Sequence, residues 1–140
     1  IQGWALETFS MAETIHGIFQ ANEFRHVWLA SETDKSFDAE SLHTINQTLT
    51  DVLLAGDLLK NRLLAKIESL AGRAHTILFV TDLEALHPYL RVGALEQKLQ
   101  GKFAIPTVFL YPGIRDGKTT LRFLGIYPPD GNYRSVHFGG

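Results

Sequence analysis

The sequence predicts an α/β fold: a Rossmann-like three-layer sandwich whose mixed sheet has parallel central strands and an antiparallel C-terminal hairpin. Two observations lead to this prediction. Short apolar, β-prone runs alternate with longer segments of helical periodicity, which is the pattern of parallel βαβ units. The last β-prone runs follow one another without a helix between them, so they should pair antiparallel. Helices are therefore expected on both faces of the sheet, joined by right-handed crossovers.

Apolar residues at helical spacing define the expected helices. Ser10 and Glu13 have the spacing of a capping box, which predicts a helix start. Asp38 is suited to cap the next helix. Gly56 marks either a kink in one long helix or the boundary between two, with Asp57 as the second cap. The helical stripes lie within residues 10–21, 42–53 and 58–70, and a further helix follows "DLEALHPYL" and runs through Leu95 and Leu99 to Gln100.

Runs rich in β-branched and aromatic residues define the expected strands. The clearest buried strand is residues 75–81, which read His-Thr-Ile-Leu-Phe-Val-Thr. Residues 25–31 are short and apolar, which is typical of a central strand. The remaining expected strands are 105–111, 121–126 and, at the sheet edge, 133–138.

Length and composition favour an ordinary globular domain. The chain has 140 residues, which fits a single α/β domain over residues 1–140, and it begins with Ile, so we expect a fragment or one domain of a longer protein. It contains no cysteine, which excludes disulfides and thiolate metal sites. No apolar run is long enough to span a bilayer, and no signal-like segment is evident. A cytoplasmic location without membrane contact is the expectation.

Charge is distributed unevenly along the chain. The net charge is −2, but residues 1–72 carry 5 Lys/Arg against 10 Asp/Glu and residues 73–140 carry 8 against 5. The second half, at +3, would favour an acidic partner, so contact with a DNA backbone is one hypothesis.

The stretch "YPGIRDGKTT" is close to a phosphate-binding P-loop. Pro112 stands where the first glycine should be, and proline removes an amide donor that a phosphate would need. The residues after Lys118 alternate polar and apolar and include β-branched and aromatic side chains, which predicts a strand where a P-loop needs a helix. Asp116 and Gly117 between two β-prone runs predict a hairpin turn, with Gly113 and Gly117 at positive φ.

Loops that follow parallel strands are expected to gather ligand-binding side chains. Asp82 and Glu84, with Asp34 or Asp116, are candidate Mg²⁺ ligands, and Asp82 is equally suited to cap the next helix. A Mg²⁺-dependent phosphate hydrolase or nuclease using Asp82, Glu84 and Asp116 is therefore one hypothesis. His87 is a candidate general base, but no nucleophile with suitable local geometry is evident, and the histidines lack zinc-ligand spacing.

Arg91 is a further candidate. It is expected one turn into the helix that follows residue 88, where it could bind a carboxylate or a phosphate in fork geometry or simply form a salt bridge.

Three stretches between residues 75 and 138 together carry a family resemblance: "TILFVTDLEALHPYLRVGALEQKL", "IPTVFLYPGIRDGKTTLRFLG" and "DGNYRSVHF". The family pattern is an apolar strand, a Tyr-Pro-hydrophobic-Arg turn into a helix, an aromatic-Pro-Gly strand end, an Asp-Gly hairpin, a Leu-x-Phe/Leu-Gly strand and a final Tyr-Arg. These three stretches follow that order, with Pro-Tyr-Leu-Arg at the turn. In this order the chain resembles BrxB proteins of BREX phage-defence systems. The matching positions are Pro88, Tyr89, Arg91, Pro106, Tyr111, Pro112, Gly113, Asp116, Gly117, Leu121, Phe123, Leu124, Gly125, Tyr133 and Arg134.

The resemblance implies a non-catalytic accessory protein of a bacterial antiviral complex, without a cofactor or a metal. Its implied partners are the alkaline-phosphatase-like protein PglZ and, through it, the DNA methyltransferase PglX and an ATPase, which would associate the chain with DNA indirectly. Tyr and Arg dominate the energetics of protein interfaces, which favours a docking surface at the strand ends. The expected binding residues are Tyr89, Arg91, Tyr111, Pro112, Gly113, Arg115, Asp116, Tyr133 and Arg134.

Overall fold

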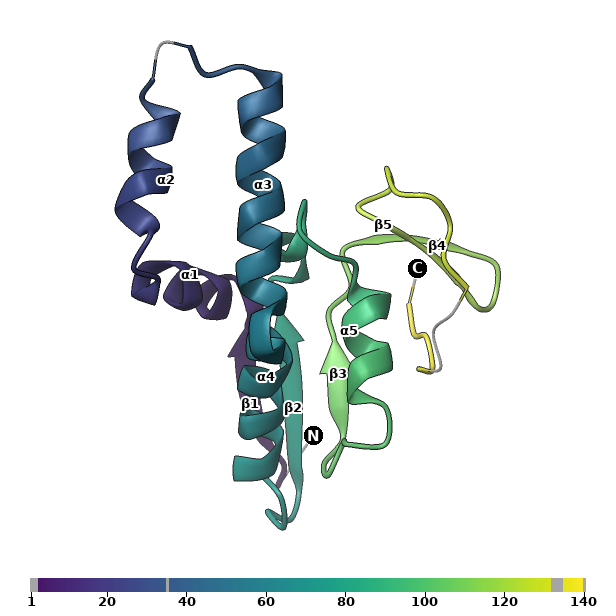
Figure 1. Cartoon of the computed structure of the whole chain (residues 1–140). Coiled ribbons are helices and arrows are strands. Elements are labelled where there is room, and N and C mark those ends of the chain that lie inside the picture. Colours follow the sequence, from purple (N-terminus) through teal and green to yellow (C-terminus); the bar gives the residue numbers. More distant parts are fainter. Residues whose placement is uncertain (1–2, 35, 132–134, 140) are drawn as a thin grey trace.

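The computed structural model describes residues 3–34, 36–131 and 135–139. Strands and helices alternate along the chain as an α/β protein requires (Figure 1). In chain order the elements are β1 (Ala5–Ser10), α1 (Met11–Ala21), α2 (Arg25–Glu32), α3 (Ala39–Leu54), the 3-10 turn η1 (Ala55–Asp57), α4 (Leu58–Ser69), β2 (Thr76–Thr81), the 3-10 turn η2 (Leu83–Leu86), α5 (Val92–Leu99), β3 (Thr107–Phe109), β4 (Gly113–Asp116) and β5 (Thr120–Phe123). Within the described ranges, no helix has the length and apolar character needed to cross a membrane.

The strands form two separate sheets. β1, β2 and β3 pair in parallel in the order β1-β2-β3, whereas β4 and β5 form an antiparallel hairpin. The parallel central strands and the C-terminal hairpin were both expected. One continuous mixed sheet was also expected, and this was wrong: β4 and β5 form a sheet of their own, and among the described residues the hairpin otherwise pairs only through Leu121 with Asp130.

Helices cover one face of the parallel sheet. Leu78 and Val80 of β2 are fully buried on that face, and Glu7 of β1 reaches Lys66 of α4 there at 2.8 Å. α4 and α5 both lie in front of the sheet in Figure 1. A second helix layer was expected, but in the described part of the chain none covers the other face, where Leu6 is 59% exposed.

The core lies between the sheet and α4 with α5. Alternate residues of β2 are buried, as they should be for a strand with one covered face. The helices supply branched side chains from one stripe each. The fully buried large side chains are Met11, Leu53, Leu63, Ile67, Leu70, Leu78, Leu83, Leu86, Leu95, Leu99, Val80 and Val92.

The first strand of the sheet is not the one the sequence predicts. Residues 25–31 form most of helix α2, and β1 lies instead at Ala5–Ser10, paired along its whole length with β2. The apolar residues Phe24, Val27 and Trp28 have i, i+3, i+4 spacing, which fits a helix face. A central strand would be buried, whereas no residue of α2 is buried. The apolar run therefore does not lie in the core as the strand prediction required.

Side-chain caps explain the starts of α1 and α3. Ser10 accepts a hydrogen bond from the Glu13 amide at 3.1 Å, and Asp38 accepts one from Ser41, so both predicted caps are confirmed. Gly56, at φ +59°, ends the first helix, so two helices form. Asp57 makes no capping bond; its carboxylate instead forms ion pairs that link α4 to α5.

The elements after β2 are shorter than the sequence indicates. The helix predicted to follow residue 88 is α5, which begins at Val92, so Arg91 is its N-cap residue rather than one turn inside it. The 3-10 turn η2 precedes it. β3 and β5 occupy the predicted strand regions but are three and four residues long. Residues 135–138 form no strand, and the rest of the sixth expected strand lies outside the described residues.

Candidate functional site

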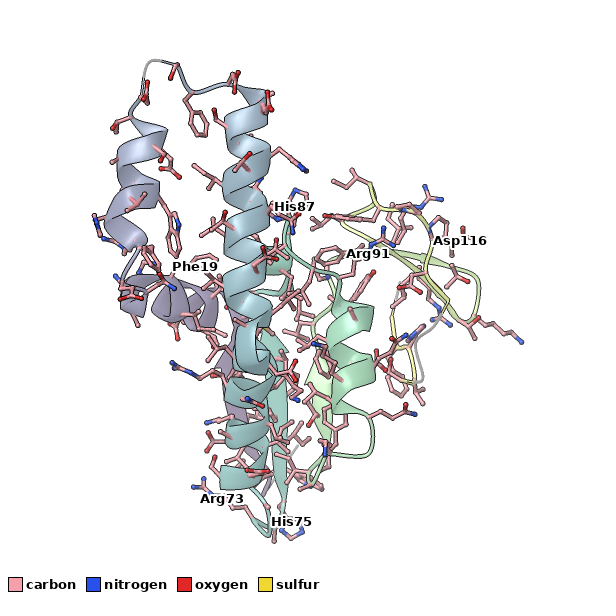
Figure 2. The ribbon with its side chains drawn as sticks, in the orientation of Figure 1. Phe19, Arg73, His75, His87, Arg91 and Asp116 are labelled. Atoms are coloured by element: carbon pink, nitrogen blue, oxygen red, sulfur yellow. The ribbon has the colours of Figure 1, made fainter. Side chains whose placement is uncertain are left out.

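Cationic and aromatic side chains gather where the segment before α5 meets the C-terminal hairpin. His87 Nδ1 and the Tyr127 hydroxyl share a hydrogen bond of 2.6 Å, and their rings pack edge to face at 5.5 Å. The guanidinium of Arg91 lies over the same Tyr127 ring, 5.1 Å from its centre. A cation at this distance is attracted by the ring quadrupole. Figure 2 shows His87 and Arg91 near each other between α3 and the hairpin, and both are exposed.

A row of rings continues from Tyr127 to the end of β3. Phe123, which is 2% exposed, lies 5.5 Å from the Tyr127 ring and 5.7 Å from the Tyr111 ring. Aromatic pairs at such separations contribute about 0.5–1.5 kcal/mol each beyond their burial. The hairpin is therefore held against the strand end by packing, although its strands belong to a different sheet.

The stretch "YPGIRDGKTT" forms the hairpin that the sequence predicts. β4 and β5 pair antiparallel, and Gly117 in the turn has φ +75°. Gly113 was also expected at positive φ, and this was wrong, because its φ is not positive. Glycine is needed at this position for space, since a Cβ would lie 2.3 Å from the Arg122 carbonyl oxygen. Since a strand follows Lys118, no helix N-terminus is available for a phosphate.

Arg115 connects the hairpin turn to the end of the chain. Its Nε donates to the Gly117 carbonyl at 2.9 Å, and its Nη1 donates to the Gly139 carbonyl at 3.2 Å. The side chain stays exposed while both contacts are made, so its charge faces solvent.

A pocket of about 640 Å³ lies between β3, the hairpin and residues 135–139. Apolar groups form much of its wall, with Phe109 and Leu121 among them. Glu96 of α5 lies at the pocket and accepts hydrogen bonds from the amide and hydroxyl of Ser135, which tie the C-terminal segment down. The pocket thus combines an apolar interior with charged groups, an arrangement common in binding sites.

The structure brings some of the expected binding residues together and separates others. Four line the pocket just described: Tyr111, Pro112, Gly113 and Arg115. Arg91 lies at the adjoining ring cluster, and Asp116 is in the hairpin, on the far side from Arg91 in Figure 2. Tyr89 packs elsewhere, and Tyr133 and Arg134 lie outside the described residues.

Tyr89 faces the first two helices. Its ring lies 5.6 Å from the Phe19 ring of α1. Burial raises the pKa of the Tyr89 hydroxyl, and the negative charge of Glu32 at the end of α2 raises it further. Tyr89 is therefore a packing residue between helices and stands apart from the pocket.

The carboxylates considered for Mg²⁺ do not gather. Asp82 accepts hydrogen bonds from the hydroxyls of Ser10 and Thr81, which join the ends of β1 and β2, and it makes no helix-capping bond. Asp116 lies in the separate hairpin. Across the described residues, no three His, Cys, Asp or Glu side chains are placed to share a metal ion. The positions of Asp82, Glu84 and Asp116 thus give no support to the hydrolase hypothesis.

Tyr127 is the residue of this cluster that sequence reasoning did not single out. Its contacts reach His87, Arg91 and Phe123, two of which are far from it along the chain. No local spacing marks such a residue, because the contacts exist only once the hairpin folds back on α5. The one feature of the sequence that could have indicated Tyr127 is its position two residues after Leu124-Gly125, where an aromatic residue follows a turn.

The fold and the site define a small α/β protein with a partly apolar pocket and exposed arginines beside it. A family model described as "BREX protein BrxB" matches residues 7–138, nearly the whole chain. The chain belongs to the BrxB family, and this membership implies a role in a BREX phage-defence system and suggests a complex with other BREX proteins. No curated protein and no solved structure is significantly similar to it. The family match begins well before the resemblance at residues 75–138 and includes β1 and the helices that follow.

Proposed function

We propose that this chain is a non-catalytic accessory subunit that docks PglZ through the pocket and the arginines beside it. The observation that carries the proposal is that four residues of one sequence motif line a single pocket of about 640 Å³, with Arg115 among them. Arginine and tyrosine are enriched among residues that dominate interface affinity, and an apolar pocket flanked by cations suits an acidic or hydrogen-bonding partner loop.

The family supports a protein partner as the ligand. A BREX phage-defence role suggests a complex with other BREX proteins, and a docking pocket is the feature that such an assembly would use. Through PglZ the subunit would be brought to the methyltransferase PglX and to an ATPase. Association with DNA would then be indirect.

Charge reversal at the two arginines tests the proposal. Arg91→Glu combined with Arg115→Glu should weaken co-purification with PglZ by about tenfold or more, because opposite charges become like charges at the interface. Phage protection should fall in parallel. Both side chains are exposed but also make contacts within the chain, so thermal melts of the variant must match the parent before a loss of binding is assigned to the interface.

Arg62→Glu is the matched control. Arg62 is an exposed cation on α4, and none of the ion pairs of the described residues includes it. This variant should bind PglZ and protect cells like the parent. If the double variant also binds and protects like the parent, the pocket is not the docking site.

A further inference from the structure

Helices α2 and α3 form an arm that extends beyond the sheet. Figure 1 shows the two helices projecting side by side, joined by a loop at the tip, on the opposite side of the molecule from the hairpin. α2 has no buried residue, and α3 buries only Leu53, near its base. We call residues 23–54 the helical arm. Most of it is folded without contributing to the core.

Each helix of the arm carries an apolar stripe that is only partly covered. On α3 the stripe begins at Leu42, which is 50% exposed, and continues through Ile45 and Leu49. On α2 it contains Phe24 and Val27, which are 55% and 47% exposed, and the half-buried Trp28, whose ring packs against Phe19. Exposed apolar surface of this extent is typical of an interaction site rather than of a solvated helix.

The arm is also acidic. Residues 23–54 contain six Asp or Glu and two Lys or Arg, a net charge of −4. Of the ion pairs among the described residues, none involves these carboxylates. Hydrogen bonds from Ser36 lower the pKa of Asp34 and those from Ser41 lower the pKa of Asp38, so both groups are charged at neutral pH.

Acidic and apolar groups meet in a groove at the arm tip. A pocket of about 420 Å³ lies between the end of α2, the loop and the first turns of α3. Its lining includes the carboxylates of Asp34, Asp38 and Glu40 together with the apolar side chains of Phe37 and Ile45. Apolar side chains beside several carboxylates match a partner that is itself both apolar and basic.

We propose that the helical arm is a second docking surface, and that its occupant is a basic amphipathic helix of a partner protein. Such a helix would lay its apolar face on the stripes of α2 and α3 and set its Lys and Arg side chains beside the carboxylates. A second copy of this chain is a poorer occupant, because two arms with net negative charge repel each other. This surface is separate from the pocket near Arg115, so the proposal does not depend on the docking site proposed above.

The test uses a designed peptide as the probe. It has about 16 residues, the length of α3, with Leu at helical i, i+3, i+4, i+7 spacing and Lys elsewhere. Fluorescence anisotropy of the labelled peptide should give saturable binding that weakens with added salt. A peptide with Glu in place of Lys, and one with the same residues in scrambled order, should each bind at least about tenfold more weakly.

Variants of the chain locate the site. Leu42→Ser and Glu40→Gln should each weaken peptide binding several-fold, whereas Leu6→Ser, at a similarly exposed position on the open sheet face, should not. Thermal melts are expected to match the parent, since Leu42 and Glu40 are exposed. Absence of binding, equal binding of the scrambled peptide, or unchanged binding by Leu42→Ser would each overturn the proposal. Dimerisation in sedimentation equilibrium that Leu42→Ser abolishes would overturn it in favour of a second copy.

Discussion

The guanidinium of Arg91 lies 5.1 Å from the centre of the Tyr127 ring, and this contact joins the start of α5 to the segment after β5. The same ring carries the hydrogen bond to His87. One tyrosine therefore connects the helical layer to a hairpin that shares no strand pairing with the parallel sheet. The position of the candidate docking pocket depends on this junction, because the hairpin forms one of its walls.

Substitutions at Tyr127 should separate its two contacts. Tyr127→Phe keeps the ring for Arg91 but removes the hydrogen bond to His87, so the free energy of unfolding should fall by about 1 kcal/mol. Tyr127→Leu removes the hydrogen bond and every ring contact, with Arg91, His87 and Phe123, and should cost more. Urea titrations measure the two losses. Equal losses in the two variants would show that the cation–ring contact contributes no stability.

Gly113→Ala should destabilise the hairpin. The added methyl would lie 2.3 Å from the Arg122 carbonyl oxygen, which belongs to the paired strand and cannot move freely. We expect a loss of about 1–3 kcal/mol in unfolding free energy, by analogy with overpacked sites. Gly131→Ala is the matched control, since its Cβ would meet only Thr120 Oγ1 at an ordinary 3.7 Å. If Gly113→Ala is as stable as Gly131→Ala, the Arg122 carbonyl is not as close to residue 113 as the structure places it.

Local signals predicted part of the fold well. Caps at Ser10 and Asp38 and the turn at Gly117 depend on residues within a few positions, so their chemistry is readable from the sequence. The strand at residues 76–81 was predictable because it is buried on one face and flanked by polar residues. The sequence also carried enough of the family motif to indicate BrxB, which the family match confirms.

Longer-range relationships escaped prediction. β1 is a strand because β2 supplies its partner across the chain, whereas its own alternation is weak and its outer face is exposed. The run at residues 25–31 has strand-like composition, but its apolar residues also fit a helix face, and the arm leaves them unburied. Burial normally decides whether such an apolar run becomes a strand or a helix. Residues 25–31 are not buried, so their composition alone cannot decide between the two. The Tyr127 contacts were hidden for the same reason: they arise only in the folded chain.

Asp57 should make stability depend on pH in the acid range. Hydrogen bonds from Lys60 and then Lys98 lower the pKa of Asp57 from 3.8 to about 2. Because the folded pKa lies below the unfolded one, the stabilisation is present above about pH 4 and is lost as pH falls toward 2. Asp57→Asn should therefore flatten this part of the stability profile in urea titrations.

Asparagine is a suitable replacement at residue 57 because the backbone there has φ 55°, which Asn tolerates. Asp51→Asn on α3 is the control, since no ion pair of the described residues includes Asp51. A profile that Asp57→Asn leaves unchanged would show that the lysines do not hold the carboxylate in solution. High salt should also reduce the effect, because the carboxylate is partly exposed.

Truncation of leucines should distinguish the core from the helical arm. Leu63 on α4 is 0% exposed and packs against the sheet, so Leu63→Ala should cost about 2–5 kcal/mol of unfolding free energy. Leu42→Ala on the arm should cost less than about 0.5 kcal/mol, because half of that side chain is already in water. Thermal and urea unfolding measure both. A large cost at Leu42 would mean that the arm's apolar stripe is buried within the free protein, in which case it could not serve as an open surface for a partner helix.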